Sequence, residues 1–454
     1  MAPAETDVTL ALYIGESFAE AHLSRNQKPV HFYRWYLGKD GLKGGLQKLL
    51  QEAEVTEIQK TFVASRFLEK IFSYRLGGSV AILATKGFEN RPGIRQPLNN
   101  KVGPLSSSEL LFGIDERCDA QGVIEKEISA DEIRDLIQKL KQKQAKRICI
   151  HFLNAHKNSA NQNKVKEALL AESFEVFIPN FDEHNLDELG QWRKNILNAS
   201  LSGTFEEIQE ELNEALKAYL PAGQRVQFFS GEGMLFDKEN HYRLSSLWGA
   251  PNTWTRNLKR AHKFDILYLG LEQFCLLQPE KTKSSWASPW GRVQVEQVHN
   301  RVLSLQPTTS IELSDWGELQ FSKNVLGYEP GPMFMGRGQI PTLMDLWGND
   351  TTGIKGIDER RSSQGMQKFK NQIWALNKTA SRPLDSEDKV LTNLRELALQ
   401  KLVLDIGLHA ENKNVVCMGA LARIFMPELK RRLPQYTFEL LPETETSFLL
   451  SQGH

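Results

Sequence analysis

"ALYIGESFAEAHLS", residues 11–24, places a short turn between two apolar runs and is typical of a tight β-hairpin. "LYLGLEQFCLLQP", residues 267–279, has the same order of Leu, Tyr, an aliphatic residue, Gly, a turn and a second apolar run. Each hairpin opens its own section of alternating strand-like and helical runs, which favours an α/β protein. The sequence therefore predicts a duplicated chain with one such hairpin in each half.

The pattern along the chain predicts two lobes. We expect an N-terminal lobe over residues 1–180, a helical connection and strand over 181–230, and a second lobe over 231–454. Residues 350–387 are rich in Gly, Ser, Lys and Arg, and we predict a mobile excursion there. Two α/β sections that each begin with a hairpin are what a duplicated actin-like ATPase fold presents. In that fold the hairpins face the phosphates of a nucleotide, which lies in the cleft between the lobes.

Local signals support several helices. Ser129 and Glu132 form the pattern of a capping box, which predicts a helix start. We also expect a helix in "WTRNLKRAHK", residues 254–263, and a long helix from about Ser386. A strand, a further helix and a final strand "YTFELLP" then complete the second lobe.

The composition restricts the class of protein. The 56 Lys and Arg balance 56 Asp and Glu, so the net charge offers no attraction to nucleic acid or to an anionic membrane. No stretch has the ~20 apolar residues that span a bilayer, and "MAPAETDVTL" lacks the basic and apolar regions of a signal peptide. Scattered cysteines without a CxxC pair suit a reducing cytoplasm, and we expect each to be a buried apolar residue. The cysteines are Cys118, Cys149, Cys275 and Cys417.

Six stretches resemble one known family, in the family's order and over nearly the whole chain. They are "AILATKGFENRPGIRQ" (81–96), "GIDERCDAQGVI" (113–124), "ICIHFLNAHKNSANQNKVKEAL" (148–169), "ILNASL" (196–201), "GYEPGPMFMGRGQIPTLMDLWG" (327–348) and "VVCMGALARIFMPELKRRL" (415–433). Together they are similar to the hydantoinase A and 5-oxoprolinase family. The resemblance implies a two-lobed, actin-like ATPase fold, of the duplicated type related to RNase H. Compared with the usual large subunit of the family, the chain looks shortened towards its C-terminus.

The first hairpin departs from the family's D-x-G-G-T-x-T-D pattern. Tyr13 stands where the family has the metal-holding Asp, and Glu16 replaces the second Gly, while a hydroxyl at Ser17 and an acid at Glu20 remain. Glycines at such a turn let backbone N–H groups approach phosphate oxygens, whereas Glu16 adds a side chain and a negative charge.

The second hairpin departs from the family's D-M-G-G-T-S-T-D pattern in the same way. Tyr268 and Cys275 replace its two acids, and Glu272 and Gln273 replace hydroxyl residues. Three further ATP-contact segments have also changed: the adenosine loop is "LQPTTSI" (305–311) without glycine, the S-G-P-A segment is "WGAP" (248–251), and a glycine–threonine strand end is "QKTFVAS". The candidate cofactor site thus consists of degenerate phosphate hairpins with doubtful binding. Its residues are Tyr13, Gly15, Glu16, Ser17, Glu20, Tyr268, Gly270, Glu272 and Gln273.

From this resemblance we expect a degenerate, non-catalytic member that acts as a binding or structural subunit with a protein partner. No cofactor, metal or catalytic residue is predicted. The alternative is an ATP-dependent amidohydrolase that opens a cyclic amide such as a hydantoin or 5-oxoproline, and that alternative requires ATP and Mg²⁺.

Several side chains allow two interpretations. We expect Tyr13 and Tyr268 to lie together and fill the space between the hairpins, with stacking on a planar ligand as the alternative. The glutamates at positions 16, 20 and 272 are expected to be solvated turn residues, with a replacement magnesium site as the alternative. "SSWASPW" (284–290) offers either an exposed partner surface or a loop packed on the core. For His151, His156 and His184 we expect surface or hydrogen-bonded roles.

Overall fold

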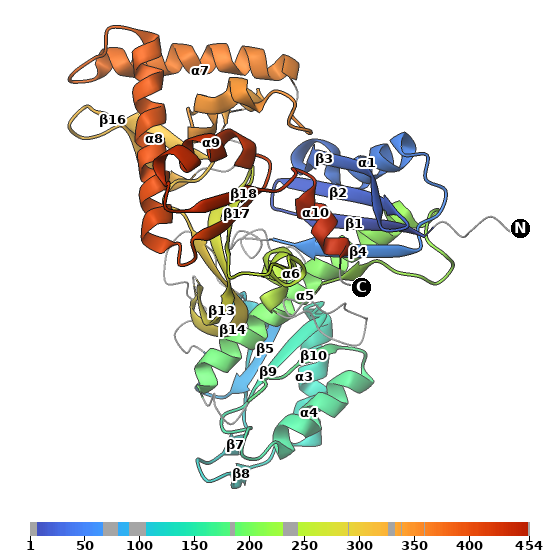
Figure 1. Ribbon diagram of the computed structural model, residues 1–454. Coiled ribbons are helices and arrows are strands. Elements are labelled where there is room, and N and C mark those ends of the chain that lie inside the picture. Colours follow the sequence, from blue (N-terminus) through green and yellow to red (C-terminus); the bar gives the residue numbers. More distant parts are fainter. Residues whose placement is uncertain are drawn as a thin grey trace, which may run out of the picture.

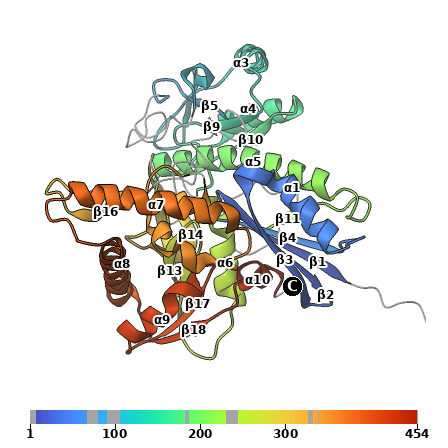
Figure 2. The same cartoon turned by 90° about the horizontal axis from the view of Figure 1, so that it is seen from above.

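A computed structural model gives the fold of the chain (Figures 1 and 2). The residues that the structure describes are 7–66, 80–89, 106–181, 187–229, 244–288, 290–325, 332–336, 338–357 and 359–452. Three larger sheets organise these residues, two in the lobes and one inserted between strands of the first lobe.

The first lobe is built on a five-stranded sheet in the order β11-β4-β1-β2-β3. β1, β2 and β3 form an antiparallel meander, whereas β4 and β11 lie parallel to β1 on its other side. The elements are β1 (Val8–Ile14), β2 (Phe18–Arg25), β3 (Lys28–Tyr36), α1 (Leu37–Glu52), β4 (Lys60–Ser65) and β11 (Gln227–Phe228). Alternate residues of β1 face opposite sides of the sheet, so that Leu10 and Leu12 pack toward α1 while Ala11 and Tyr13 face the second lobe.

The second lobe repeats this topology with a five-stranded sheet in the order β14-β13-β12-β17-β18. β12, β13 and β14 form the antiparallel meander, and β17 and β18 continue parallel to β12. The elements are β12 (Asp265–Leu269), β13 (Phe274–Ser288), β14 (Gly291–Val302), β17 (Asn414–Met418), α9 (Ala422–Arg432) and β18 (Thr437–Leu440). The two equal strand orders confirm the predicted duplication and the two-lobed, actin-like fold.

A four-stranded parallel sheet, β10-β9-β5-β6, is inserted between β4 and β11. Its elements are β5 (Val80–Thr85), β6 (Leu111–Ile114), β7 (Arg117–Cys118), β8 (Ile124–Lys126), α3 (Ala130–Gln142), β9 (Arg147–His151), α4 (Ala160–Ala171), β10 (Glu175–Phe177) and α5 (Glu188–Leu216). α3 and α4 cover one face, and α5 covers the other and runs on to the first lobe (Figure 2). The capping box of Ser129 and Glu132 is present at the start of α3, as predicted.

The second lobe carries its own addition between β14 and β17, namely the hairpin of β15 (Thr309–Leu313) and β16 (Leu319–Val325) and the helices α7 (Glu359–Thr379) and α8 (Glu387–His409). Ser386 caps α8 as expected. α7 lies within the segment for which we predicted a mobile excursion. Its Phe369 and Ile373 are fully buried in the core of the second lobe, so this part of the segment is a packed helix.

Two helices lie between the lobes, α6 (Gly249–Asn257) and α10 (Glu445–Ser451), as both views show. α6 begins and ends earlier than the helix predicted at residues 254–263, and α10 was not predicted. A single apolar cluster joins the two sheets through these helices; it includes Ala11 and Phe62 of the first lobe and Ile266 and Met418 of the second. Short 3₁₀ helices complete the fold at Ser108–Leu110, Leu244–Trp248, Met333–Met335 and Leu343–Thr351. None of the described helices combines the length and apolarity needed to cross a bilayer.

Candidate functional site

The turns of the two hairpins have matching geometry and face each other. The N–H of Gly15 donates to the carbonyl of Phe18 at 2.9 Å, and the N–H of Gly270 donates to the carbonyl of Gln273 at 3.1 Å. On the strands before these turns, the hydroxyl oxygens of Tyr13 and Tyr268 are 3.5 Å apart. The predicted proximity of the two tyrosines is therefore confirmed.

Trp254 of α6 fills the space beside the tyrosine rings. Its ring centroid lies 5.6 Å from that of Tyr13 and 5.0 Å from that of Tyr268, which it stacks at an interplanar angle of 26°. The indole N–H donates to the carbonyl of Thr446 at 2.7 Å, which ties α6 to α10. All three rings are buried, and burial raises the pKa of both phenols, so they stay neutral. The expectation that aromatic side chains fill the space between the hairpins is therefore confirmed. Trp254 takes the position for which stacking of the tyrosines on a planar ligand was the alternative.

Glu272 of the second hairpin reaches across to the backbone of the first hairpin. Its Oε1 accepts hydrogen bonds from the N–H of Phe18 at 2.8 Å and from the N–H of Ser17. Gly15 permits this approach, because a Cβ atom at that position would fall 2.0 Å from Oε2 of Glu272. A carboxylate of the chain itself therefore occupies the hairpin amides that, by the family resemblance, approach a phosphate.

The environment of Glu272 opposes its ionisation. The residue keeps part of its surface exposed, but its carboxyl group is enclosed by protein. Desolvation by burial, followed by the charge of Glu16, raises the pKa of Glu272 to about 7. The hydrogen bonds from the two amides and the charge of Arg66 act in the opposite direction.

Arg66 follows β4 directly and crosses to the second lobe. Its Nη2 donates to Oε1 of Gln273 and, at 2.8 Å, to Sγ of Cys275, and its guanidinium lies 4.6 Å from the centroid of the Tyr268 ring. Arg66 is 3% exposed, so this contact is internal. Sequence reasoning missed Arg66, although a charged residue directly after the apolar run of β4 is a signal for it.

Glu20 has hydrogen-bond partners outside the hairpin turns. Nε of Arg34 donates to its Oε1 at 2.8 Å, the hydroxyl of Thr446 donates to its Oε2, and Arg34 also pairs with Glu443. Glu20 is 4% exposed, so the expectation of a solvated turn residue is wrong for it; it is wrong also for Glu272, whose carboxyl group points inward. The two carboxyl groups have different donors: Glu20 accepts from Arg34 and Thr446, whereas Glu272 accepts from the backbone of the first hairpin. Within the described ranges, no three His, Cys, Asp or Glu side chains are grouped to hold a metal ion.

The other altered segments support the backbone near the hairpins. The side chain of Gln306 accepts from the N–H of Phe274 at 2.9 Å and donates to its carbonyl at 3.0 Å, which fixes residues 305–311 on the second hairpin. Gly249 is the first residue of α6 and lies close to β4. A Cβ atom at position 249 would lie 3.1 Å from the carbonyl oxygen of Phe229. Ser65 at the end of β4 donates to the carbonyl of Ser246 at 2.8 Å.

Comparison with known proteins identifies similar sequences and folds. The family model of the hydantoinase/oxoprolinase N-terminal region matches residues 23–173. The gamma subunit of acetophenone carboxylase from Aromatoleum aromaticum is 22% identical over 179 residues, which cover 35% of this chain and 24% of that subunit. Residues 23–173 are therefore similar to the N-terminal region of the hydantoinase/oxoprolinase family.

Two solved structures share the fold of this chain over almost its whole length. Nucleotide-free acetone carboxylase has a TM-score of 0.66 at 14% identity and is matched over 98% of this chain and 70% of its own. The ATP-dependent caprolactamase from Pseudomonas jessenii has a TM-score of 0.69 at 15% identity, over 97% of this chain and 70% of its own. This chain thus spans 70% of the length of each of these two structures and 24% of the carboxylase subunit.

Family-like stretches of the inserted sheet meet at the carboxyl ends of its strands. The buried carboxylate of Glu116 accepts from the hydroxyl of Thr85 and, at 3.1 Å, from the amide of Asn161. The Thr85 hydroxyl in turn accepts from the N–H of Leu153 at 2.8 Å. Three stretches that are far apart in sequence are thus joined by one buried polar network.

The long family-like stretch at residues 327–348 lies partly outside the described residues. In its described part, the carboxylate of Asp345 accepts from the N–H of Phe334 at 2.6 Å and from the N–H of Thr342 at 2.7 Å. Asp345 is fully buried, and its role is to hold two loops together.

The tryptophans of "SSWASPW" do not form an exposed surface. Trp290 is 1% exposed and belongs to the apolar core of the first lobe, and Trp286 packs edge-on against Trp248 at 5.4 Å. The segment is the end of β13 and the turn to β14. The interpretation as an exposed partner surface built on these two rings is therefore wrong, and the alternative of a segment packed on the core is confirmed. In the described residues Trp316, in the turn between β15 and β16, is the tryptophan with a large exposed fraction, 84%.

The histidines and cysteines have structural surroundings. His151 is buried, stacks on Trp192 at 5.3 Å and lies 3.1 Å from the amide of Asn195, and burial lowers its pKa to about 3. His156 lies 3.7 Å from the carboxylate of Glu188. His184 lies outside the described residues. All four cysteines are buried and unpaired, as expected.

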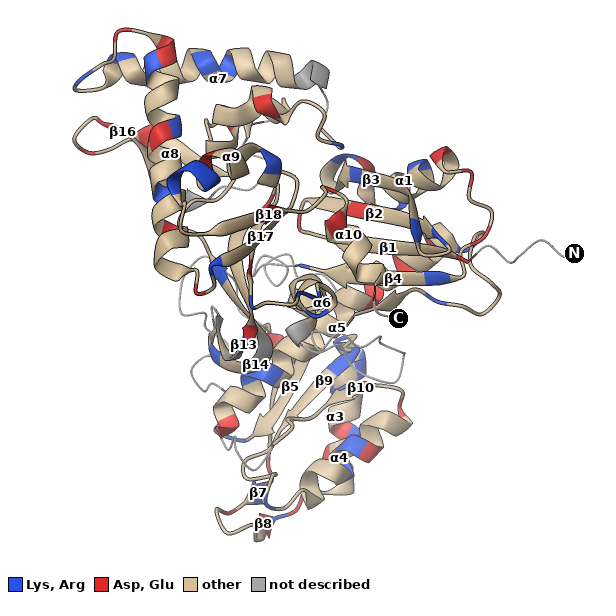
Figure 3. Cartoon of the chain, viewed as in Figure 1, with Lys and Arg blue, Asp and Glu red and all other residues tan. Residues whose placement is uncertain are grey.

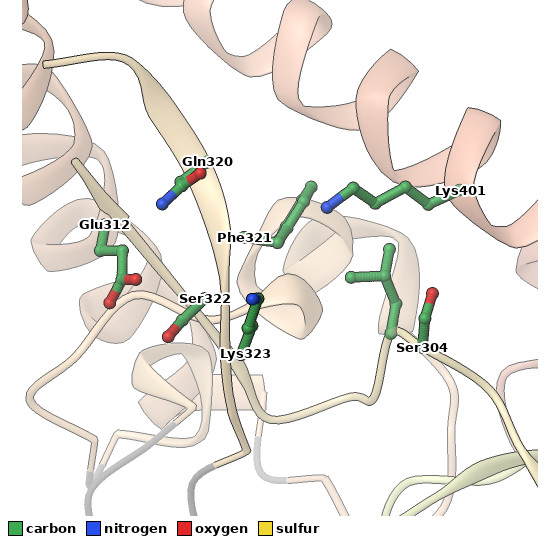
Figure 4. A pocket seen from close by; sticks show the side chains of 8 residues that line it. Ser304, Glu312, Gln320, Phe321, Ser322, Lys323 and Lys401 are labelled. Atoms are coloured by element: carbon green, nitrogen blue, oxygen red, sulfur yellow. The ribbon is translucent and has the colours of Figure 1, made fainter. Parts of the chain in front are cut away.

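A separate pocket of about 410 Å³ lies beside β16 and α8, on the addition to the second lobe (Figure 4). Its lining residues are Ser304, Leu305, Glu312, Gln320, Phe321, Ser322, Lys323 and Lys401. None of these residues belongs to the two hairpins. Leu305 is the one lining residue that lies in residues 305–311, the segment that the family resemblance assigns to adenosine. Figure 3 shows that both positive and negative residues occur along the elements of both lobes and of the inserted sheet.

Proposed function

We propose that this chain is a non-catalytic member of the hydantoinase/oxoprolinase family: a binding or structural subunit of a protein complex, without ATPase activity. The observation that carries the proposal is the position of Glu272, whose carboxylate takes up the N–H groups of Ser17 and Phe18. A carboxyl group of the chain itself already accepts from the donors that a phosphate would need.

Electrostatics and packing add to this argument. A nucleotide phosphate would meet the carboxylates of Glu16 and Glu272, and like charges at such distances repel. Where the family resemblance requires acids that hold a metal, Tyr13 and Tyr268 are neutral phenols packed on Trp254. Phosphoryl transfer depends on positioned donors and metal ions, so the loss of both leaves little to stabilise its transition state.

The alternative is an ATP-dependent amidohydrolase that acts on a cyclic amide. The observation in its favour is the likeness to the ATP-dependent caprolactamase over 97% of this chain. In that case Glu272 would have to leave the hairpin amides before ATP and Mg²⁺ enter.

Calorimetric titration with Mg–ATP tests the proposal. We expect no stoichiometric binding at micromolar affinity, because the hairpin amides are occupied and two carboxylates face the phosphate position. The ATP-dependent caprolactamase from Pseudomonas jessenii, titrated in the same buffer, is the positive control. A one-to-one complex of micromolar affinity or better, together with ATP-dependent ring opening of a cyclic amide, would establish the alternative.

Association with a second subunit is the positive part of the proposal. A relative is a gamma subunit by name, and we expect this chain to form a complex of fixed stoichiometry with the product of a neighbouring gene. Co-expression followed by size-exclusion chromatography with mass measurement would detect it. If the contact includes the exposed ring of Trp316, the W316A variant should bind at least tenfold more weakly, with an unchanged melting temperature. A chain that stays monomeric beside every such product would contradict the proposal.

The compartment and the domain limits stay proposals. Four buried, unpaired cysteines fit a reducing compartment, for which we propose the cytoplasm.

The limits at residues 180 and 230 remain a prediction, and β11, from the predicted connection, pairs with β4 in the first sheet.

A further inference from the structure

Glu272 is a direct polar link between the two hairpins. It lies in the turn after β12, whereas its hydrogen-bond donors are the N–H group of Ser17, in the turn before β2, and that of Phe18, the first residue of β2. Separation of the lobes would break both bonds and transfer the carboxyl group from an enclosed site to water. The ionisation of Glu272 and the separation of the hairpins are therefore linked.

We propose that Glu272 is a proton-linked latch between the two lobes, which holds the hairpins together when its carboxyl group is protonated and releases them more readily when it is ionised. The inference rests on the part of the proposed function that assigns the hairpin amides to Glu272. It adds a control by pH of how far the hairpins open.

The groups around Glu272 decide the direction of this effect. Glu16, in the turn of the first hairpin, disfavours the ionised form, and Arg66, after β4, favours it. Tyr13 of β1 and Tyr268 of β12 face the same space, and both remain neutral phenols. Repulsion and burial exceed the attraction of Arg66, since the pKa of Glu272 in the closed form is raised to about 7.

The sign follows from comparison of the closed and open forms. The closed form has the raised pKa of about 7, whereas in the open form the carboxyl group meets water and its pKa returns toward the usual 4.5. Between these values opening releases a proton, so the open fraction rises as the pH rises from 4.5 to 7. Above pH 7 both forms are ionised and the open fraction is level. The difference, 7 − 4.5 = 2.5 pKa units, corresponds to a change of roughly 300-fold in the opening equilibrium.

Hydrogen exchange of the first hairpin tests the latch on the full chain without nucleotide. We expect the protection factors of the Ser17 and Phe18 amides, corrected for intrinsic exchange, to fall by up to about tenfold per pH unit from pH 5 to 7. Above pH 7 they should be constant. The amides of β9 in the inserted sheet are the internal reference and should show no such change.

Two variants separate a latch from a merely structural contact. Glu272→Gln retains the shape and an acceptor oxygen but cannot ionise, and its protection should be independent of pH. Glu16→Gln removes the repelling charge, which lowers the pKa of Glu272, so the level region should begin at a lower pH. Melting curves verify that both variants are folded, and Glu280→Gln, at a partly exposed surface ion pair, is the matched control that should behave as the unmodified chain.

The results that overturn the latch differ from those that overturn the proposed function. Protection that is independent of pH in the unmodified chain, or an equal pH dependence in Glu272→Gln, would exclude the latch and leave the non-catalytic proposal untouched. If Mg–ATP binds and the protection of the Ser17 and Phe18 amides still falls with pH, the non-catalytic proposal is refuted and the latch stays in place.

Discussion

Replacing Trp254 with alanine should lower the free energy of unfolding by about 3–5 kcal/mol, the usual range for large aromatic residues in a core. The indole is fully buried, contacts Tyr13 and Tyr268, and donates to the carbonyl of Thr446. Its removal leaves a cavity at the junction of both lobes with α10, and it also removes a hydrogen bond from that junction. Urea denaturation followed by circular dichroism measures the loss.

A matched variant separates this effect from a general loss of tryptophan. Trp316→Ala removes the same side chain from an exposed turn, and its free energy of unfolding should change by at most about 0.5 kcal/mol. Trp254→Phe, which keeps an aromatic ring, should fall between the two. A loss below about 1 kcal/mol for Trp254→Ala would contradict the view that packed rings hold the lobes together.

Replacing Arg34 with methionine should cost about 3–5 kcal/mol, because it leaves the buried carboxylate of Glu20 and the partly buried carboxylate of Glu443 without their cation. Arg34 is 1% exposed, bonds Glu20 through Nε at 2.8 Å, and also pairs with Glu443 before α10. The cost comes from an uncompensated charge, so it should shrink when the charge is removed as well. We therefore expect the double variant Arg34→Met/Glu20→Leu to be more stable than Arg34→Met alone.

An exposed pair provides the control for this prediction. Lys60 bonds Asp7 at 2.9 Å, with about half of each side chain in solvent, and Lys60→Met should cost no more than about 1 kcal/mol. Urea denaturation at pH 7 compares all variants. If Arg34→Met loses as little as Lys60→Met, or if the double variant is the least stable, the buried ion network does not stabilise the junction.

Local patterns predicted much of the fold and part of the site. The echo of Leu, Tyr, an aliphatic residue and Gly at positions 12 and 267 predicted two hairpins, and both sheets have the same strand order. This worked because β-hairpins and capped helices are specified by residues that are close in sequence. The same echo predicted that Tyr13 and Tyr268 would meet, since a duplicated fold brings equivalent positions together.

Other residues of the site could not be found from such patterns. The partners of Glu20 are Arg34, 14 residues away, and Thr446, 426 residues away, and nothing in the surrounding sequence of Glu20 distinguishes it from a solvated acid. The packing of α10 between the lobes was missed for the same reason. Trp290 was expected in a loop that could be exposed, although it is a core residue, because burial depends on what other elements place over a side chain.

The sequence by itself determined the duplicated hairpins, the family resemblance, and the loss of the acids and glycines that the family uses at its phosphate site. Periodicity and motifs carry this information because they depend on neighbours along the chain. Only the tertiary structure decided what replaced the lost residues: Trp254 between the tyrosines, Arg66 on Gln273, and Glu272 on the amides of Ser17 and Phe18. The contacts of Arg66 with Gln273 and of Glu272 with Ser17 join residues 207 and 255 positions apart. Desolvation and hydrogen bonding at such contacts depend on the folded surroundings rather than on the local sequence.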